Sequence, residues 1–253
     1  MTEEVLRKVI LHYHLFKNAG TSIDALLKHN FPDQWVTKEF ASSPAANRKQ
    51  VADWILENPQ AVCFSSHTAM LPPPDLPGVQ VLPIIFVRHP IDRVASAYAF
   101  ECKQGGASFG AVLARNTTLK GYVEVRLALG HDRQCRNFQV TRFAQMFKDT
   151  EGNETERALR ALATLPFVGL VEKFEQSVDT LTQYLTPHFP AFHALHVAKN
   201  VIRNTSIPIE QKLAEIKAEI GDACYAELLE ANAADMALYH STEKTDSKSR
   251  SFE

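Results

Sequence analysis

The sequence has few of the features that mark disulfide-rich, metal-binding, membrane-spanning, secreted or nucleic-acid-binding proteins. Its 253 residues contain four cysteines, and their spacing fits neither a disulfide-rich scaffold nor a metal site. No apolar run is long enough to cross a bilayer, and the short charged start does not have the form of a signal peptide. The formal net charge of −2 excludes a global attraction to nucleic acid or to an anionic membrane. These absences predict a cytoplasmic protein with reduced thiols, no nucleic-acid partner and no integral membrane segment.

The residues that are present predict one α/β domain. A hydrophobic content of 45% with 22% charged residues is ordinary for a soluble globular protein, and a chain of this length can bury one core. Apolar runs alternate with stretches of helical periodicity, which is typical of a parallel sheet with right-handed crossovers. We expect strands near 8–16, 61–66, 80–87 and 166–171, and helices near 21–29, 44–57, 91–103, 174–185, 208–220 and 223–240.

A pair of glycines marks a change in the middle of the chain. Gly105 and Gly106 open a mainly helical insert of about residues 104–148, after which the α/β pattern returns. We interpret residues 1–240 as a single domain that ends in helices. The polar residues 241–253 are predicted to form a flexible tail.

Residues 9–22, VILHYHLFKNAGTS, predict a strand, a tight loop and the start of a helix. Unpaired N–H groups at a helix start attract anions, and Lys17 adds a full positive charge beside them. Thr21 and Ser22 add hydroxyl donors. The segment therefore predicts an anion site, although an ordinary strand-to-helix turn with a solvated Lys17 and a capping Ser22 has the same pattern.

Residues 81–98, VLPIIFVRHPIDRVASAY, repeat this order of strand and helix. Pro90 suits the first helical turn, where its missing N–H does no harm. Arg88 falls at the carboxyl end of the strand, where ligands collect in parallel sheets, and its forked guanidinium suits a phosphate. Ser96 lies about two turns along the helix. The alternatives are a strand-end salt bridge for Arg88 and a small helix-packing residue for Ser96.

These two segments resemble those of sulfotransferases that use 3′-phosphoadenosine 5′-phosphosulfate (PAPS). Residues 14–22 resemble the 5′-phosphosulfate loop, and residues 87–98 resemble the 3′-phosphate segment. Weaker likenesses follow in order at residues 137–142 and 167–175. The resemblance is to the carbohydrate branch, which includes heparan sulfate 2-O-sulfotransferase. It implies a P-loop-like sulfotransferase fold in which the insert determines acceptor specificity.

Three residues depart from the pattern of that family. Phe16 stands where the family often has proline, and Ala19 replaces a frequent glycine, so the close backbone approach must tolerate a methyl group. His89 replaces the usual aspartate after the arginine, which puts any structural role of that carboxylate in doubt. A histidine there is neutral or positive and does not weaken an anion site.

The resemblance also implies roles for individual residues. Lys17 would meet the negative charge that develops on the bridging oxygen of PAPS as PAP leaves, and no metal is required. A later segment, residues 199–206, resembles the loop that closes over the nucleotide, although a solvated loop is an equal interpretation. The full set of expected nucleotide contacts is Lys17, Asn18, Ala19, Gly20, Thr21, Ser22, Arg88, Ser96, Lys199, Arg203 and Thr205.

The acceptor hydroxyl also needs a base within hydrogen-bond reach. His67 ends a short apolar strand between the two phosphate segments, and the heparan sulfate enzyme carries its base in a similar context. A structural histidine is the alternative. Glu101 or Asp92 could serve instead, whereas His14 is predicted to orient the loop from behind.

Two other functions fit part of this pattern. A nucleotide-dependent kinase shares the strand-loop-helix order, but its lysine normally follows the glycines and it needs Mg²⁺. A non-catalytic nucleotide-binding protein could keep the same fold without transferring a group. We favour transfer from PAPS to a hydroxyl, with a saccharide as the expected acceptor because of the branch that the segments resemble.

Overall fold

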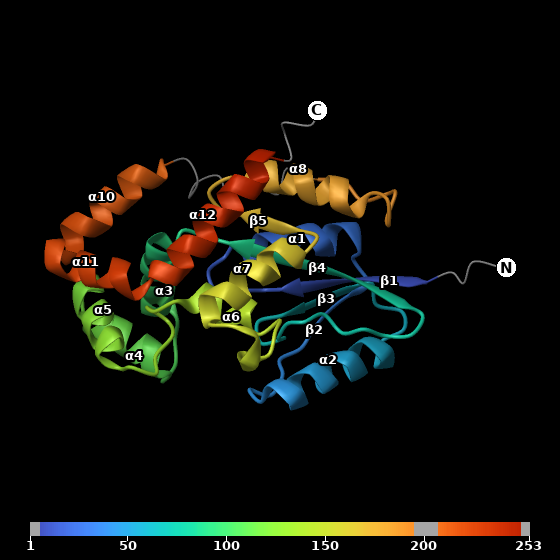
Figure 1. Cartoon of the computed structure of the whole chain (residues 1–253), viewed down its shortest axis with the longest axis horizontal. Coiled ribbons are helices and arrows are strands. Elements are labelled where there is room, and N and C mark those ends of the chain that lie inside the picture. Colours follow the sequence, from blue (N-terminus) through green and yellow to red (C-terminus); the bar gives the residue numbers. More distant parts are fainter. Residues whose placement is uncertain (1–5, 195–206, 249–253) are drawn as a thin grey trace.

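A computed structural model describes residues 6–194 and 207–248 and contains a five-stranded parallel sheet (Figure 1). The strands lie in the order β2-β3-β1-β4-β5, and every neighbouring pair is parallel. All carboxyl ends therefore meet at one edge of the sheet. The strands are β1 (Arg7–Tyr13), β2 (Trp35–Thr37), β3 (Cys63–Ser66), β4 (Val79–Val87) and β5 (Val168–Leu170).

Helices cover both faces of the sheet, and the alternation along β1 decides which residue meets which helix (Figure 1). Val9 and Leu11 are buried in a cluster with residues of α2, α6, α7 and α12, whereas Ile10 is buried in a cluster with α1 and α8. These helices are α1 (Gly20–Asn30), α2 (Pro44–Glu57), α6 (Phe138–Ala144), α7 (Glu154–Thr164), α8 (Phe174–Leu185) and α12 (Ala233–Lys248), with a 3₁₀ turn η1 (Asp149–Glu151) before α7.

A third apolar cluster lies beside the sheet and is formed by helices, with Cys135 added from the loop before α6. Ile91 and Val94 of α3 pack there with Tyr122 and Val123 of α5 and with the C-terminal helices. The remaining helices of the described residues are α3 (Pro90–Lys103), α4 (Phe109–Asn116), α5 (Leu119–Ala128), α10 (Ile209–Ile220) and α11 (Asp222–Ala231). No helix within the described ranges is long and apolar enough to cross a membrane.

The structure confirms the α/β class, the parallel sheet and the helical insert, which holds α4, α5 and α6. It adds β2, which the sequence did not predict because three edge-strand residues carry little pattern. It also corrects the C-terminal helix. Two helices replace the one expected over 223–240, and α12 continues to Lys248, into the residues for which a flexible tail is predicted.

Side-chain contacts explain both differences at the C-terminus. Asn232, between the two helices, donates to the carbonyl oxygens of Leu228 and Cys135, each at 2.8 Å, and these bonds hold the break in place. Beyond residue 240, Thr242 is buried and donates to the carbonyl of Leu238 at 2.9 Å. A polar sequence therefore remains helical because one side of α12 packs against the domain.

Candidate active site

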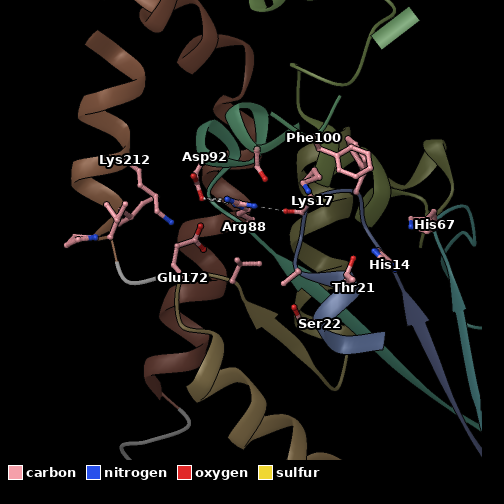
Figure 2. Close-up of a pocket in the computed structure, with 18 residues that line it drawn as sticks. His14, Lys17, Thr21, Ser22, His67, Arg88, Asp92, Phe100, Glu172 and Lys212 are labelled. Carbon is pink, nitrogen blue, oxygen red and sulfur yellow. Dashed lines mark hydrogen bonds and ion pairs between the residues drawn. The ribbon is translucent and has the colours of Figure 1, made fainter. Parts of the chain in front are cut away.

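A cavity of about 330 Å³ opens at the carboxyl edge of the sheet (Figure 2). Four of its residues follow four strand ends, and they lie in the order of the strands: His67 after β3, His14 after β1, Arg88 after β4 and Glu172 after β5. Eight of the nine expected nucleotide and catalytic positions within the described residues line it together: Lys17, Ala19, Gly20, Thr21, Ser22, His67, Arg88 and Ser96.

The loop after β1 has the form of an anion cradle. Ala19 has a positive φ of 60°, and no acceptor within the described residues takes the N–H groups of Gly20 and Thr21 at the start of α1. A Cβ placed on Gly20 would collide with the ring of His14, so this position requires glycine. Gly20 and Thr21 both line the cavity, so these N–H groups are available to a bound anion from a loop whose shape is fixed by packing.

Lys17 occupies the middle of the cavity (Figure 2). Its Nζ lies 4.5 Å from the centroid of the Phe100 ring, and no carboxylate within residues 6–194 and 207–248 pairs with it. Burial, and then the nearby charge of Arg88, lower the pKa of Lys17. An ammonium in such surroundings is stabilised by any anion that enters the cavity.

Arg88 is buried and contacts two partners in the protein, Asp92 and the backbone of Lys17. Its Nε and Nη2 both lie 2.7 Å from Oδ2 of Asp92, and its Nη1 donates to the backbone carbonyl of Lys17 at 3.0 Å. The strand-end salt bridge that was the alternative for Arg88 is thus present, in a side chain that also lines the cavity. Because the guanidinium has five N–H groups, donors remain for a bound anion.

Gln139 joins the loop after β1 to the end of β4 through hydrogen bonds. Its Oε1 accepts from Nδ2 of Asn18 at 2.7 Å and from the backbone N–H of Arg88 at 2.9 Å, and its Nε2 donates to the Arg88 carbonyl at 2.8 Å. Asn18 is consequently buried and does not line the cavity, so its side chain holds the loop instead. Sequence reasoning noted residues 137–142 only as a resemblance and gave Gln139 no role.

His67 stands at the open end of the cavity with half of its side chain exposed. Its Nδ1 lies 2.7 Å from Oε1 of Glu39, a residue that sequence reasoning did not single out. Of the other candidate bases, Glu101 does not line the cavity and bonds instead to Tyr122 and Arg126.

His14 lies inside the cavity rather than behind it. Its ring centroid is 4.0 Å from that of His67, and its Nδ1 is 2.9 Å from Oδ2 of Asp24. Asp24 also accepts from His12 and from Ser65. Burial opposes ionisation of Asp24, but these hydrogen bonds hold its pKa well below the usual range.

Two of these histidines and Asp24 are also the candidate metal ligands among the described residues. His12, His14 and Asp24 offer ligand atoms within 4.8 Å of one another. Their N-to-O distances of 2.8 and 2.9 Å are ordinary hydrogen-bond lengths. The geometry is therefore that of two imidazoles that share one carboxylate.

Glu172 was also missed at the sequence level. Its Oε1 accepts from the backbone N–H of His89 at 2.8 Å, whereas its buried Oε2 has no hydrogen-bond partner among the described residues. Burial raises the pKa of Glu172 to about 7. Burial also lowers the pKa of His89 to about 4, so the residue that replaces the usual aspartate is neutral near pH 7.

The other wall of the cavity is formed by the segment that precedes and begins α10. Ile207, Pro208, Ile209 and Lys212 line it there. The expected contacts Lys199, Arg203 and Thr205 precede this segment and lie outside the described residues.

Two comparisons with known proteins give the family of the chain. Residues 6–240 match the sequence model of the sulfotransferase family. Over 240 residues the chain is 44% identical to an uncharacterized protein of Archaeoglobus fulgidus, in an alignment that covers 92% of this chain and 95% of that protein. The chain therefore belongs to the sulfotransferase family.

Proposed function

We propose that this sulfotransferase moves the sulfuryl group of PAPS to a hydroxyl of a saccharide. The observation that carries the proposal is the meeting of three parts in one cavity: the Lys17 loop, Arg88 and His67. Two cationic segments at the carboxyl edge of the sheet suit a nucleotide with anionic groups at two positions. A half-exposed imidazole beside them suits an acceptor that enters from solvent.

The two ends of the nucleotide are assigned by the two segments. The N–H groups of Gly20 and Thr21, with the hydroxyls of Thr21 and Ser22, would hold the 5′ phosphosulfate at the start of α1. The remaining donors of Arg88, with the hydroxyl of Ser96, would hold the 3′-phosphate. Lys199, Arg203 and Thr205 remain predicted contacts from the following segment.

The transfer step needs few groups. In the proposed reaction His67 takes the proton from the acceptor hydroxyl, whose oxygen forms a bond to sulfur as the bond from sulfur to the bridging phosphate oxygen breaks. Lys17 offsets the negative charge that this bridging oxygen gains, and PAP is the second product. Positioning and charge compensation supply the catalysis.

The mouth of the cavity supports an acceptor with an apolar ring face. Phe100 is 40% exposed there, and its ring lies 5.5 Å from that of Phe16 in an edge-to-face pair. An exposed aromatic pair can pack against the C–H face of a sugar. A phenol could use the same rings, so the choice of a saccharide depends on the branch that the segments resemble.

The test combines binding with transfer. Calorimetry should detect PAP, and PAP should raise the melting temperature more than ATP with Mg²⁺ does. PAPS with a labelled sulfur should then label a chitin oligosaccharide, with 2-naphthol and a long-chain alcohol as competing acceptor classes, and EDTA should not inhibit. Absence of PAP binding would reject the function, and labelling of naphthol alone would reject the saccharide.

A further inference from the structure

We propose that Glu39 is the positioning residue of the base, holding His67 in the tautomer and orientation that accept a proton. This inference rests on the proposed function, in which His67 is that base. Nothing in the local sequence around Glu39 marks it. Its role follows from the register of the sheet and from its hydrogen bonds.

The register brings Glu39 to His67. In the parallel pair β2 and β3, Trp35 lies opposite Cys63 and Thr37 lies opposite Ser65. Two residues beyond this pair in each strand direction, position 39 falls opposite position 67. Both residues therefore leave the sheet at the same edge, where the cavity opens.

Hydrogen bonds fix both oxygens of the Glu39 carboxylate. Oε1 accepts from Nδ1 of His67 at 2.7 Å and from the His67 backbone N–H at 3.3 Å. Oε2 accepts from the hydroxyl of Thr68 at 2.8 Å. Burial opposes ionisation, but these bonds lower the pKa of Glu39, so the carboxylate is anionic near neutral pH.

An anionic acceptor at Nδ1 decides which nitrogen of His67 is free. The proton of a neutral imidazole is held at Nδ1 when a carboxylate accepts from it, which leaves the Nε2 lone pair to take a proton. A carboxylate that orients a histidine base and stabilises the imidazolium follows the logic of the serine-protease triad. Glu39 would act on the reaction only through His67.

The neighbours of His67 show why an anion is needed there. The His14 ring lies 4.0 Å away, and His12 stacks on His14 from the far side at 5.3 Å. Asp24 is shared among His12, His14 and Ser65 and makes no bond to His67. Among residues 6–194 and 207–248, Glu39 is thus the carboxylate that directly offsets a positive charge formed on His67.

The first experiment reads the tautomer and needs no acceptor. Long-range ¹H–¹⁵N spectra of the imidazole rings, with the His67 signals assigned by their loss in His67→Gln, should give the Nδ1–H tautomer in the wild type. Glu39→Ala should shift His67 toward the Nε2–H form. A wild-type Nε2–H tautomer, or no change in Glu39→Ala, would overturn the proposal.

The second experiment measures turnover with whichever acceptor the labelled PAPS identifies. Glu39→Gln conserves shape and should lower kcat by at least about 10-fold while the Kd for PAP changes less than twofold. The acidic limb of its pH profile should move to lower pH, which a purely structural defect would not cause. The matched control is Glu124→Gln on α5, since the two side chains are 48% and 50% exposed. A Glu39→Gln protein with the wild-type kcat and limb would contradict the inference.

A double variant tests whether Glu39 acts through His67. Adding Glu39→Ala to His67→Ala should cause no further loss of turnover, because the bond partner is already gone. An additive loss would assign Glu39 another role. Failure of wild-type PAP binding would instead reject the proposed function, and the tautomer spectra would still decide the role of Glu39.

Discussion

Lys17 and Arg88 lie in one cavity and are joined by a hydrogen bond, yet their surroundings are opposite (Figure 2). The ammonium of Lys17 rests against an aromatic ring without a carboxylate partner among the described residues. The guanidinium of Arg88 is buried in an ion pair with Asp92. The difference teaches that a group expected to meet changing charge remains uncommitted, whereas a group expected to hold a fixed phosphate is anchored to the fold.

The largest expected effect is the fall in kcat when the Lys17 ammonium is removed. Lys17→Ala should lower kcat by about 10²- to 10³-fold, because the developing charge on the leaving oxygen loses its compensating cation. The urea midpoint should stay at the wild-type value, since no ion pair is lost. The exposed Lys120 on α5 gives the control, as Lys120→Ala should change neither quantity. An unaltered kcat in Lys17→Ala would remove its assigned role.

Removal of the Arg88 side chain should lower the stability of the protein as well as its affinity for the nucleotide. Arg88→Ala leaves the buried Asp92 without its partner, and we expect the free energy of unfolding to fall by about 3 kcal/mol. Lys49→Ala breaks an exposed pair of the same i,i+4 spacing and should cost less than about 0.5 kcal/mol. Urea unfolding measures both. Equal effects would mean that burial does not distinguish the two pairs.

Glu172, in the same cavity, should make the stability of the protein depend on pH. Its pKa is about 7 in the folded protein and 4.5 ordinarily, so the folded protein keeps this proton while the unfolded chain has released it. Wild-type stability therefore falls as the pH rises from 4.5 to 7. Glu172→Gln lacks this loss and should gain stability relative to the wild type, reaching about 3 kcal/mol at pH 8. Parallel stability curves for the two proteins would exclude a raised pKa.

The smallest expected effect is a change in stability on substituting Ala19, in the Lys17 loop. Ala19 has a φ of 60°, a left-handed conformation that costs an L-residue about 1–2 kcal/mol. Ala19→Gly should relieve this cost and, after the larger entropy loss of glycine, stabilise the protein by up to about 1 kcal/mol. Ala214→Gly, at an exposed position inside α10, should destabilise it by about 1 kcal/mol. A loss of stability in both variants would show that the loop is not strained at Ala19.

Sequence reasoning succeeded where the signal is local. The bounds of α2 and α8 agree with the expected ranges 44–57 and 174–185, because apolar periodicity marked their length. Lys17 and Arg88 could be placed at strand ends for the same reason. Glu39 gave no such signal, since it follows a three-residue edge strand and its importance depends on a partner 28 positions away.

The sequence by itself determined the order of strands and helices, and with it the residues that follow each strand end. Those properties depend on side-chain periodicity and on backbone sterics within a few residues. Only the tertiary structure decided that Gln139 joins the Lys17 loop to Arg88 and that Glu39 meets His67. It also kept the polar end of α12 helical. Contacts of this kind depend on sheet register and on packing between distant segments, which no local stretch of the chain specifies.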